Sequence, residues 1–247
     1  MEITVKDLGL CNYSTTLSKQ ELTREKLIQN KGKNTLFLVE HDHIYTLGKN
    51  ANPKNILKDN CEIIQTDRGG DVTYHGPGQL VGYPIIDLRK TEMGIKSYVK
   101  NIESLLIATL NDYSINAHTK DNQPGVWIQN KKIGSIGIHV SRGVTTHGFS
   151  LNVNTDMNYF SNIISCGIDD VLMTSMEKEL GTNFFMNDIK QSIPIEIFPN
   201  LIININSTDV FAKQIHYIIS RKLKGIFHHG SKDLIIHDEF IFSIIKN

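Results

Sequence analysis

The chain is most informative at residues 68–79, which read RGGDVTYHGPGQ and lead into an apolar run around Tyr83. Four glycines in this stretch permit positive φ angles and a close approach of another group to the backbone. Such a loop can wrap a ligand and direct backbone N–H groups toward it. The pattern matches neither the GxGxxG motif nor a P-loop, so on its own it indicates a tight connection more often than a binding site.

A second group of small residues favours the ligand-binding interpretation. It comprises residues 132–137 (KIGSIG), 147–154 (HGFSLNVN) and 165–168 (SCGI). Glycines inside strands weaken a sheet and mark a bulge or a place where a ligand lies against the backbone. We therefore expect Gly134, Gly137 and Gly148 to border a narrow channel. A straight hydrocarbon chain buried in such a channel would gain about 0.8 kcal/mol per CH₂ group.

The residues around these motifs predict a mixed α/β or α+β domain. Short runs rich in β-formers, bounded by Gly, Asn or Asp, are expected to be strands at 35–40, 61–66, 81–87, 125–129, 133–140 and 146–153. Apolar residues at helical spacing predict one helix over 95–110, and similar patterns predict helices at 18–29, 170–180 and 209–223. The 95–110 helix should pack on the sheet.

Length and composition favour an ordinary globular protein. The chain has 247 residues, 40% of them hydrophobic and 21% charged. Lys plus Arg and Asp plus Glu each total 26, so no overall field attracts nucleic acid or an anionic membrane. We expect a catalytic domain over residues 1–190 and a C-terminal extension over 191–247, packed on the same domain, for which the sequence assigns no role.

The cysteines and the N-terminal residues bear on the compartment. Cys11, Cys61 and Cys166 are odd in number and form no CxxC pair, which argues against a disulfide framework and a structural zinc site. No apolar run approaches the roughly 20 residues that cross a bilayer, and the start lacks a leader pattern. We expect a reducing compartment, the bacterial cytoplasm, with an organelle as the alternative.

The motifs together resemble the octanoyl-[acyl carrier protein]:protein octanoyltransferases, also called lipoyl(octanoyl) transferases. The resemblance covers roughly residues 8–183. The residues that carry it are EHDHIYTLG at 40–48, the 68–79 stretch, GVWI at 125–128, KIG at 132–134, HGFSLNVN at 147–154, CG at 166–167 and TS at 174–175.

The resemblance implies the fold of the biotin and lipoate protein ligase catalytic domain, a mixed sheet flanked by helices with the acyl chain held across it. It also implies a catalytic pair in which Cys166 is the nucleophile and Lys132, just before the Ile-Gly pair, is its partner. Lys131 is the local competitor, and strand periodicity alone does not choose between them. The resemblance places substrate contacts at Arg68, Gly69, Gly70, Asp71, Val72, Thr73, Tyr74, His75, Ser135, Ile136, Gly137, Gly148, Phe149 and Ser150.

The implied reaction needs no cofactor. An octanoyl or lipoyl group would pass from acyl carrier protein to Cys166 and then to a lysine of the lipoyl domains of 2-oxoacid dehydrogenase E2 subunits or of the glycine cleavage H protein. Because going from thioester to amide is downhill, no nucleotide is required. Backbone N–H groups of residues 69–73 or near Gly167 are candidate donors to the oxyanion.

The sequence departs from the family pattern at two places, and several residues also allow a purely structural interpretation. Ser165 stands where the family usually has Pro before the cysteine, and Asp42 and His43 stand where it usually has prolines. Cys11 and Cys61 are expected to be small buried apolar residues. The histidines suggest a metal only weakly, and His75 and His147 are expected to orient loops. The alternative functions are an ATP-dependent lipoate or biotin ligase and a non-catalytic carrier-binding module.

Overall fold

The structure is a computed structural model that describes residues 2–58, 60–165 and 171–194, together with the short strands at 202–203, 227–228 and 235–236. Its contacts divide the chain into two units. One comprises Met1–Thr4 with Pro199–Asn247, and the other comprises Val5–Phe198. The helix expected at 209–223 lies outside the described residues. The proposed boundary near residue 190 stays a prediction.

The larger unit is built on one mixed sheet with the order β1-β2-β6-β10-β9-β8-β7, and β11 joins it beside β9. The strands are β1 (Glu2–Leu10), β2 (Asn34–Glu40), β6 (Gln79–Ile85), β7 (His118–Lys120), β8 (Gln123–Ile128), β9 (Lys131–Ser141), β10 (Val144–Asn152) and β11 (Leu172–Met173). The pairs from β2 through β6, β10, β9 and β8 to β7 are antiparallel, whereas β11 runs parallel to β9.

A second, three-stranded sheet carries part of the Gly-rich stretch. Its order is β4 (Glu62–Gln65), β3 (Ile44–Leu47) and β5 (Val72–His75), with β3 and β5 antiparallel. The stretch expected to be a loop is therefore a loop only at its two ends. In the other unit, β12 (Ile202–Ile203) pairs with the first residues of β1, and β13 (Phe227–His228) pairs with β14 (Ile235–Ile236).

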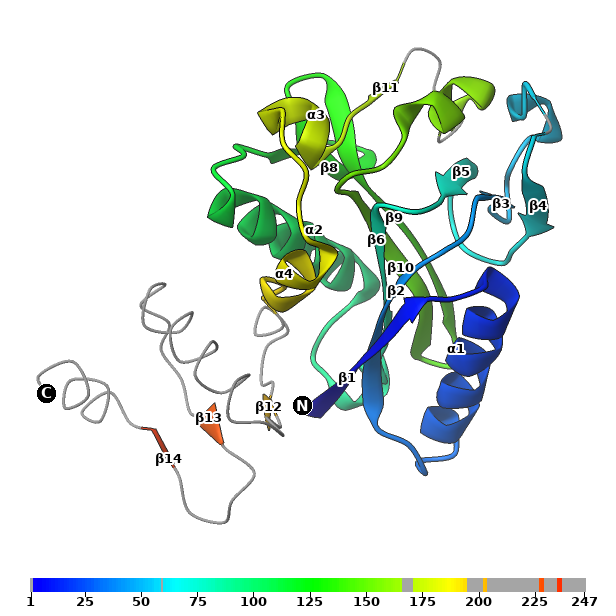
Figure 1. Ribbon diagram of the computed structural model, residues 1–247. Helices are drawn as coiled ribbons and strands as arrows, with labels where there is room; N and C mark the ends of the chain where they lie inside the picture. Colours follow the sequence, from blue (N-terminus) through cyan, green and yellow to red (C-terminus); the bar gives the residue numbers. More distant parts are fainter. Residues whose placement is uncertain are drawn as a thin grey trace, which may run out of the picture. The chain divides into compact units, whose positions relative to one another are not determined.

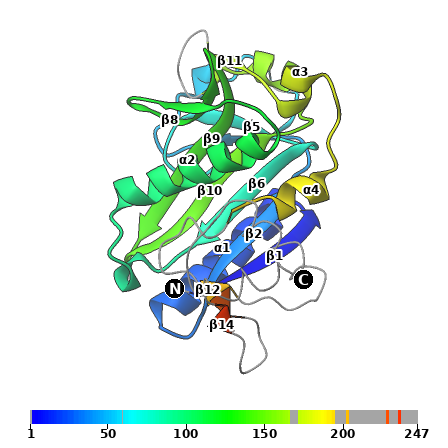
Figure 2. The same ribbon diagram turned by 90° about the vertical axis from the view of Figure 1, so that its left-hand side faces the viewer.

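Helices cover both faces of the large sheet (Figure 1). The helix α1 (Tyr13–Ile28) lies on one face and contacts β2, β6 and β10. On the other face, α2 (Ile95–Asp112) crosses β8 and β9, and Figure 2 shows it in front of these strands. The shorter helices are α3 (Met176–Leu180) and α4 (Met186–Gln191), and 3₁₀ turns occupy Pro53–Asn55, Leu88–Lys90 and Met157–Asn162.

The apolar face predicted for α2 forms core contacts. Tyr98, Ile102, Leu105 and Leu106 are all 0% exposed, and the hydroxyl of Tyr98 donates to the carbonyl of Pro84 at 2.9 Å. Each of the predicted strands is present, with shifts of one or two residues at the ends. The mixed α/β fold with a sheet flanked by helices is confirmed.

Two of the expected helices differ from the observed ones at their N-terminal ends, whereas α2 begins at residue 95 as predicted. The helix α1 begins at Tyr13 rather than residue 18 because the side chain of Asn12 accepts hydrogen bonds from the backbone N–H groups of Ser14 and Thr15. The helix expected at 170–180 is wrong in its first half, since Leu172 and Met173 pair with β9 and α3 starts only after the Ser175 cap.

The two described cysteines are half-buried rather than fully buried. Cys11 packs against the core beneath α1, and Cys61 packs against the core of the small sheet. Neither forms a disulfide bond with another described residue. Within the described residues, no helix combines the length and the apolar character that crossing a membrane requires.

Candidate active site

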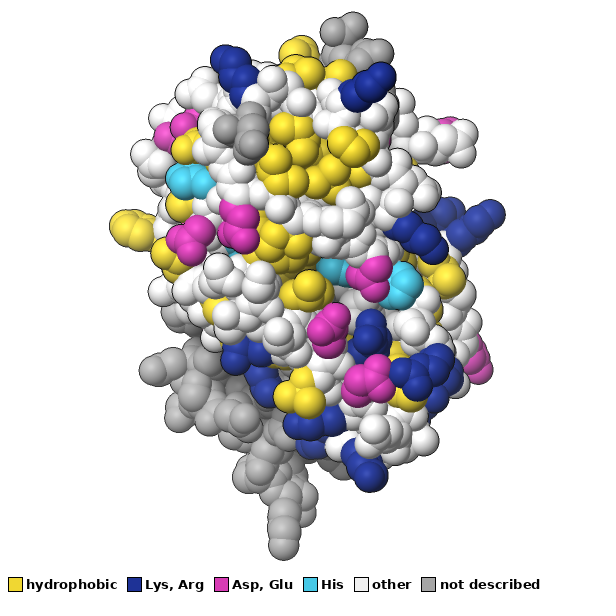
Figure 3. All heavy atoms as spheres, turned by 90° about the vertical axis from the view of Figure 1, so that its right-hand side faces the viewer, with side chains coloured by type: hydrophobic (Ala, Val, Ile, Leu, Met, Phe, Trp, Pro, Cys, Tyr) yellow, Lys and Arg dark blue, Asp and Glu magenta, His cyan; other side chains and the backbone are white. Residues whose placement is uncertain are grey.

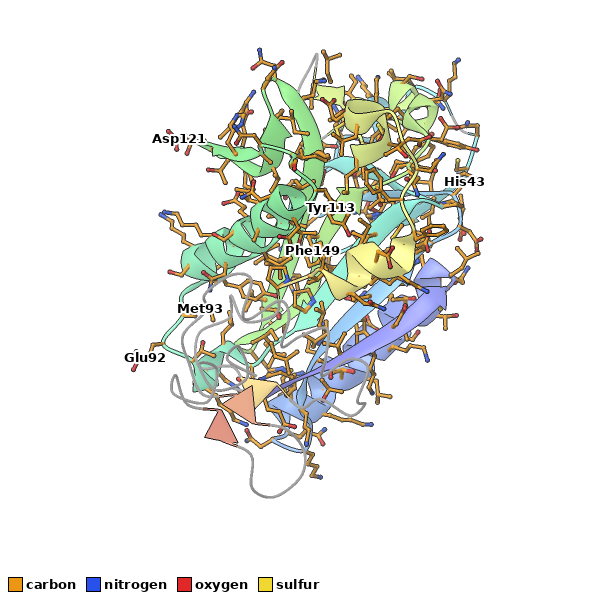
Figure 4. All side chains as sticks on the ribbon, turned by 60° about the vertical axis from the view of Figure 1, so that its left-hand side comes forward. His43, Glu92, Met93, Tyr113, Asp121 and Phe149 are labelled. Atoms are coloured by element: carbon orange, nitrogen blue, oxygen red, sulfur yellow. The ribbon has the colours of Figure 1, made fainter. Side chains whose placement is uncertain are left out.

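A cavity of about 370 Å³ opens where the Gly-rich stretch meets the large sheet. It brings together most of the residues that the sequence assigned to the site. Those that line it are Arg68, Gly69, Gly70, Asp71, Val72, Thr73, His75, Lys132, Ser135, Ile136, Gly137, Gly148, Phe149 and Ser150. In Figure 4 the labelled Phe149 lies in the interior near α2, whereas His43 lies at the periphery.

Two residues assigned from the sequence are not among these lining residues. Cys166 lies outside the described residues. Tyr74 packs instead in the core of the small sheet with Tyr45 and Phe160, and its hydroxyl lies 2.7 Å from Nδ1 of His43. Since Thr73 and His75 line the cavity, the alternation of β5 places Tyr74 on the opposite side.

Arg68 fixes the start of the Gly-rich stretch. Its Nη2 donates to the carbonyl and hydroxyl oxygens of Thr46 at 2.5 and 2.9 Å, and its Nη1 donates to the carbonyl of Gly69 at 3.1 Å. The side chain is 7% exposed. The guanidinium therefore holds the stretch against β3, and Arg68 is also one of the cavity-lining residues.

The glycines allow the stretch to lie directly on β9. The backbone N–H of Gly69 donates to the carbonyl of Ile138 at 2.9 Å, and a Cβ atom on Gly137 would lie 2.9 Å from the carbonyl oxygen of Gly69. Gly70 has a φ of +88°. The N–H of Gly69 is thus already bonded, as is that of Val72, which donates to Oδ1 of Asp71 at 2.6 Å. Neither is available as the oxyanion donor considered above.

Lys131 and Lys132 leave β9 in different directions. The ammonium of Lys131 forms an ion pair with Glu179 of α3. Lys132 is only 4% exposed and lines the cavity, and its Nζ lies 5.3 Å from the centre of the Trp127 ring on the neighbouring strand β8. Of the two, only Lys132 is among the cavity-lining residues, and its role as the partner of Cys166 stays a prediction.

Described residues on both sides of residues 166–170 are held beside the cavity. On one side, the N–H of Ile164 donates to the carbonyl of Asn55 at 2.8 Å, and Ser165 is 5% exposed. On the other side, Met173 pairs with Lys132, and the N–H of Thr174 donates to the carbonyl of Lys132 at 3.0 Å. After residue 170 the chain therefore re-enters the described part next to the strand that carries Lys132. Before residue 166 it leaves next to Asn55, whose side chain bonds to Asp71 of the cavity wall.

A group of buried histidines and tyrosines lies at one end of the cavity: His75 and Tyr83 line it, and the ring of His41 packs against both of them. His41 accepts from the hydroxyl of Tyr83 through Nε2 at 2.9 Å, because its Nδ1–H donates to the carbonyl of Cys11 at 2.6 Å. His75 donates through Nδ1 to Gln79 at 2.7 Å. Burial lowers the pKa of His41 to about 4 and that of His75 to about 3. Both rings are therefore neutral near pH 7.

The tyrosine hydroxyls at this end stay protonated. Burial raises the pKa of Tyr13, the first residue of α1, to about 12 and raises that of Tyr83 well above its usual value. Neither hydroxyl therefore ionises near neutral pH. That of Tyr83 donates to Nε2 of His41, whereas that of Tyr13 has no hydrogen-bond partner among the described residues.

His147 faces the same cavity from β10 in an unusual backbone conformation. Its φ is +57°, and its Nε2 lies 2.6 Å from Oδ1 of Asp67. The hydrogen bond from His147 lowers the pKa of Asp67 to about 2, whereas burial lowers the pKa of His147 itself. Among the described residues, Nδ1 of His147 has no hydrogen-bond partner. This supports the expected orienting role, since the ring is fixed by a carboxylate.

Several lining residues were not predicted from the sequence. They are Tyr13, Val81, Tyr83, Val99, Asn122, Gln123, Pro124, Ile138 and His147. Tyr13 and Val99 come from α1 and α2, so only the packing of the helices brings them to the site. His147 stands at the start of the quoted 147–154 motif and was the one residue with a sequence signal. Within the described ranges, no three His, Cys, Asp or Glu side chains gather in a way that could hold a metal ion.

The chain matches one family model and many curated relatives. The model describes the lipoyl protein ligase A/B catalytic domain and matches residues 12–198. An octanoyltransferase of Alkaliphilus metalliredigens is 44% identical over 189 residues, which cover 73% of this chain and 87% of the relative. Octanoyltransferases of Koribacter versatilis and Geobacter sp. are 43% and 40% identical, covering 76% and 79% of this chain and 79% and 96% of theirs.

Solved structures with a similar fold are lipoate protein ligases. A bipartite lipoate protein ligase of Thermoplasma acidophilum, described with its E2 lipoyl domain, has a TM-score of 0.63 at 14% identity, covering 90% of this chain and 93% of that one. Lipoate-protein ligase A bound with ATP has a TM-score of 0.51 at 13% identity, covering 99% and 94%. At such identities the likeness shows the fold alone, and it confirms the ligase-like fold predicted from the motifs.

Proposed function

The chain belongs to the lipoyl protein ligase A/B catalytic domain family, and from this premise we propose that it transfers an octanoyl or lipoyl group from acyl carrier protein to a lysine of lipoyl domains. Its reaction class is that of its relatives, the octanoyltransferases, so it is an acyltransferase. The acceptors are the lipoyl domains of 2-oxoacid dehydrogenase E2 subunits and the glycine cleavage H protein. This would be the first step of endogenous protein lipoylation.

The first half of the proposed reaction loads the enzyme. Lys132 takes the proton from the thiol of Cys166, and the thiolate attacks the carbonyl carbon of the carrier thioester. The carbon–sulfur bond to the carrier's arm breaks, and the departing thiolate takes the proton back from Lys132. The octanoyl group then remains on Cys166 as a thioester.

The second half delivers the acyl group. The neutral amine of the acceptor lysine attacks the Cys166 thioester, the bond to sulfur breaks, and an amide forms. Lys132 accepts the proton that the amine loses and returns one to the cysteine sulfur. Because a thioester is replaced by an amide, the step is downhill without ATP.

The main observation in support of this proposal is that Lys132 is buried at the cavity wall. Its neighbour Lys131 is engaged with Glu179, so the strand presents one amine to the cavity. The backbone of Lys132 also bonds to residue 174, just after the stretch that contains Cys166. These contacts support Lys132 as the residue that exchanges a proton with Cys166.

The cavity wall supports an acyl chain as the ligand. Val99, Ile136 and Phe149 offer apolar surface, and the volume of about 370 Å³ is of the size that holds small ligands. Each buried CH₂ group would contribute about 0.8 kcal/mol. We therefore propose that the predicted contacts at residues 68–73, 75, 135–137 and 148–150 surround the acyl group and its thioester.

The ATP-dependent ligase is the alternative with a specific observation in its favour, the shared fold with lipoate-protein ligase A bound with ATP. The relatives at 40–44% identity are octanoyltransferases, which favours the ATP-independent route. We also propose a cytoplasmic location, in keeping with the bacterial relatives, and a C-terminal extension over 191–247 beyond the catalytic domain.

The experiment that tests the proposal is intact-protein mass measurement after incubation with octanoyl-acyl carrier protein and no ATP. We expect one octanoyl adduct on the parent chain, removed when a lipoyl domain is added, and none on Cys166→Ala. Lys132→Met should load far more slowly, whereas Lys131→Met should load normally. Acylation of the acceptor only in the presence of ATP would establish the ligase instead.

A further inference from the structure

The segment between Gly48 and Lys58 is basic and borders the site. It reads GKNANPKNILK, with three lysines and no acidic residue. Lys49, Lys54 and Lys58 are all exposed, and none of them forms an ion pair with another described residue. Several basic side chains elsewhere are neutralised, as Arg89 is by Asp87 and Lys190 by Asp7.

Hydrogen bonds fix this segment to the cavity wall. The N–H of Lys49 donates to the carbonyl of Arg68 at 2.8 Å, and the N–H of Gly48 donates to the carbonyl of Asp71 at 3.2 Å. The side-chain amide of Asn55 donates to Oδ2 of Asp71 at 2.9 Å. Arg68 and Asp71 both line the cavity, so the basic segment forms part of its surroundings.

The same segment is fixed to the residues that precede Cys166. The N–H of Leu57 donates to the carbonyl of Asn162 at 2.8 Å, and Ile56 forms a β-bridge with Ile163. The carbonyl of Asn55 accepts from Ile164. The segment that carries the lysines is therefore bonded to residues that lie two to four positions before the proposed nucleophile in the chain.

Apolar surface accompanies the lysines. Leu57 is 57% exposed and lies in the sequence between Lys54 and Lys58, and Ile63 of β4 is 37% exposed. Figure 3 shows a hydrophobic area in the upper part of this face, at the height of β3, β4 and β5, with Lys or Arg side chains at its margins. A basic rim around exposed apolar side chains is the surface that an acidic protein domain would contact.

We infer that residues 48–58 form the docking surface for the donor, an acidic carrier protein whose acyl group hangs on a phosphodiester-linked arm. This inference rests on the proposed function. Three lysine ammonium groups complement both the acidic surface of such a carrier and the phosphate of its arm. The acceptor fits this surface less well, because its reactive side chain is itself a lysine, and its ammonium form is repelled.

The test compares two triple variants that carry the same change of charge. One is Lys49→Glu/Lys54→Glu/Lys58→Glu. Its matched control is Lys19→Glu/Lys26→Glu/Lys31→Glu, which alters exposed lysines of α1 and the turn after it. Initial rates of octanoyl transfer are measured with three varied substrates: octanoyl-acyl carrier protein, the neutral donor octanoyl-N-acetylcysteamine, and the lipoyl domain.

For the first variant we expect KM for octanoyl-acyl carrier protein to rise about tenfold or more with little change in kcat. The KM values for the neutral donor and for the lipoyl domain should stay within twofold of the parent. The difference from the parent should shrink as salt is added, because screening weakens exposed charges. The control variant should show none of these changes.

Other results would overturn the inference without touching the proposed function. A rise in KM confined to the lipoyl domain would assign the surface to the acceptor. Equal losses in both triple variants would show a general charge effect, and a loss with the neutral donor would place the lysines in the chemistry. Lys49→Gln/Lys54→Gln/Lys58→Gln, which only removes charge, serves if the Glu variant misfolds. Failure of the parent chain to transfer from any donor would instead refute the proposed function.

Discussion

The Nζ of Lys132 lies 5.3 Å from the centre of the Trp127 ring, and the two residues face each other as a cross-strand pair of β8 and β9. A cation over an indole is stabilised by about 1–2 kcal/mol when it is partly desolvated. Lys120 of β7 places a second ammonium 4.3 Å from the same ring. The Trp127 indole thus contacts one lysine ammonium from each neighbouring strand, and one of these lysines, Lys132, is the proposed proton-transfer group.

Replacing Trp127 should therefore slow transfer without weakening substrate binding. We expect Trp127→Phe to lower kcat about threefold and Trp127→Leu about tenfold, because the ring that holds the amine is first weakened and then lost. KM should change little. Lys120→Met is the control, since it removes the cation that does not reach the cavity. Parent kcat in a folded Trp127→Leu protein would contradict the positioning role.

Replacing Lys132 should reduce the rate of transfer far more than replacing Lys131. Lys132→Met keeps the length of a buried side chain and removes its amine, so transfer should fall by at least 100-fold. Lys131→Met removes a partly exposed ion pair with Glu179, which should cost less than about 1 kcal/mol of stability and leave kcat within twofold. Steady-state rates and thermal unfolding measure the two effects. Equal losses of activity would show that the ion pair, not the cavity amine, matters.

The fold was predictable wherever local pattern and tertiary burial agree. The helix α2 has an apolar stripe that is buried in the structure, and its bounds were predicted within two residues. The beginning of α1 was missed because its first turns are rich in Ser and Thr, and only the Asn12 cap marks the start. The strand β11 is too short to show a pattern of alternating apolar and polar residues. It forms by pairing with β9, which the local sequence does not reveal.

The site was predictable where one motif supplies several neighbours. Residues 68–73 are consecutive in the sequence and all of them line the cavity, so one motif was enough to predict them. The family motif favoured Lys132 over Lys131, whereas no local pattern connects Glu179, the ion-pair partner of Lys131, with β9. Tyr13, from the start of α1, and Val99, from the middle of α2, reach the cavity only through helix packing.

The buried histidines should make the protein sensitive to acid. His41 is 0% exposed and its pKa is lowered to about 4 by burial, whereas in the unfolded chain it titrates near 6.5. Between these values the unfolded state binds the proton and the folded state does not. Stability is therefore fully present above about pH 6.5 and falls toward pH 4, by about 3 kcal/mol for this residue.

Chemical denaturation at several pH values checks this. His41→Gln, which does not titrate, should lower stability at pH 7.5 because it perturbs the bonds to Cys11 and Tyr83, yet its stability should fall less steeply below pH 6.5. His75, with a pKa of about 3, should extend the remaining loss to lower pH. A slope in His41→Gln equal to that of the parent would show that the acid response arises elsewhere.

Phe149 should limit the length of acyl chain that the cavity accepts. It lines the cavity, is 3% exposed, and its ring lies against Gly82, where a Cβ atom would come within 2.1 Å of the ring. Phe149→Ala removes the ring and should let chains longer than octanoyl enter, each added CH₂ contributing up to about 0.8 kcal/mol of binding. The rate with dodecanoyl thioester relative to octanoyl should rise by at least tenfold. Stability should fall by about 3–5 kcal/mol, as for other buried Phe→Ala changes.

Leu105→Ala separates the two effects of the Phe149 change. Leu105 is fully buried in α2 and is not among the cavity-lining residues, so its truncation should cost about 2–5 kcal/mol of stability and leave the preference for chain length unchanged. Competition between octanoyl and dodecanoyl donors, read as the ratio of kcat/KM values, measures the preference independently of how much protein is folded. If both variants relaxed the preference equally, loosening of the core would explain the result. If neither did, the acyl chain would have to lie along another part of the cavity, away from Phe149.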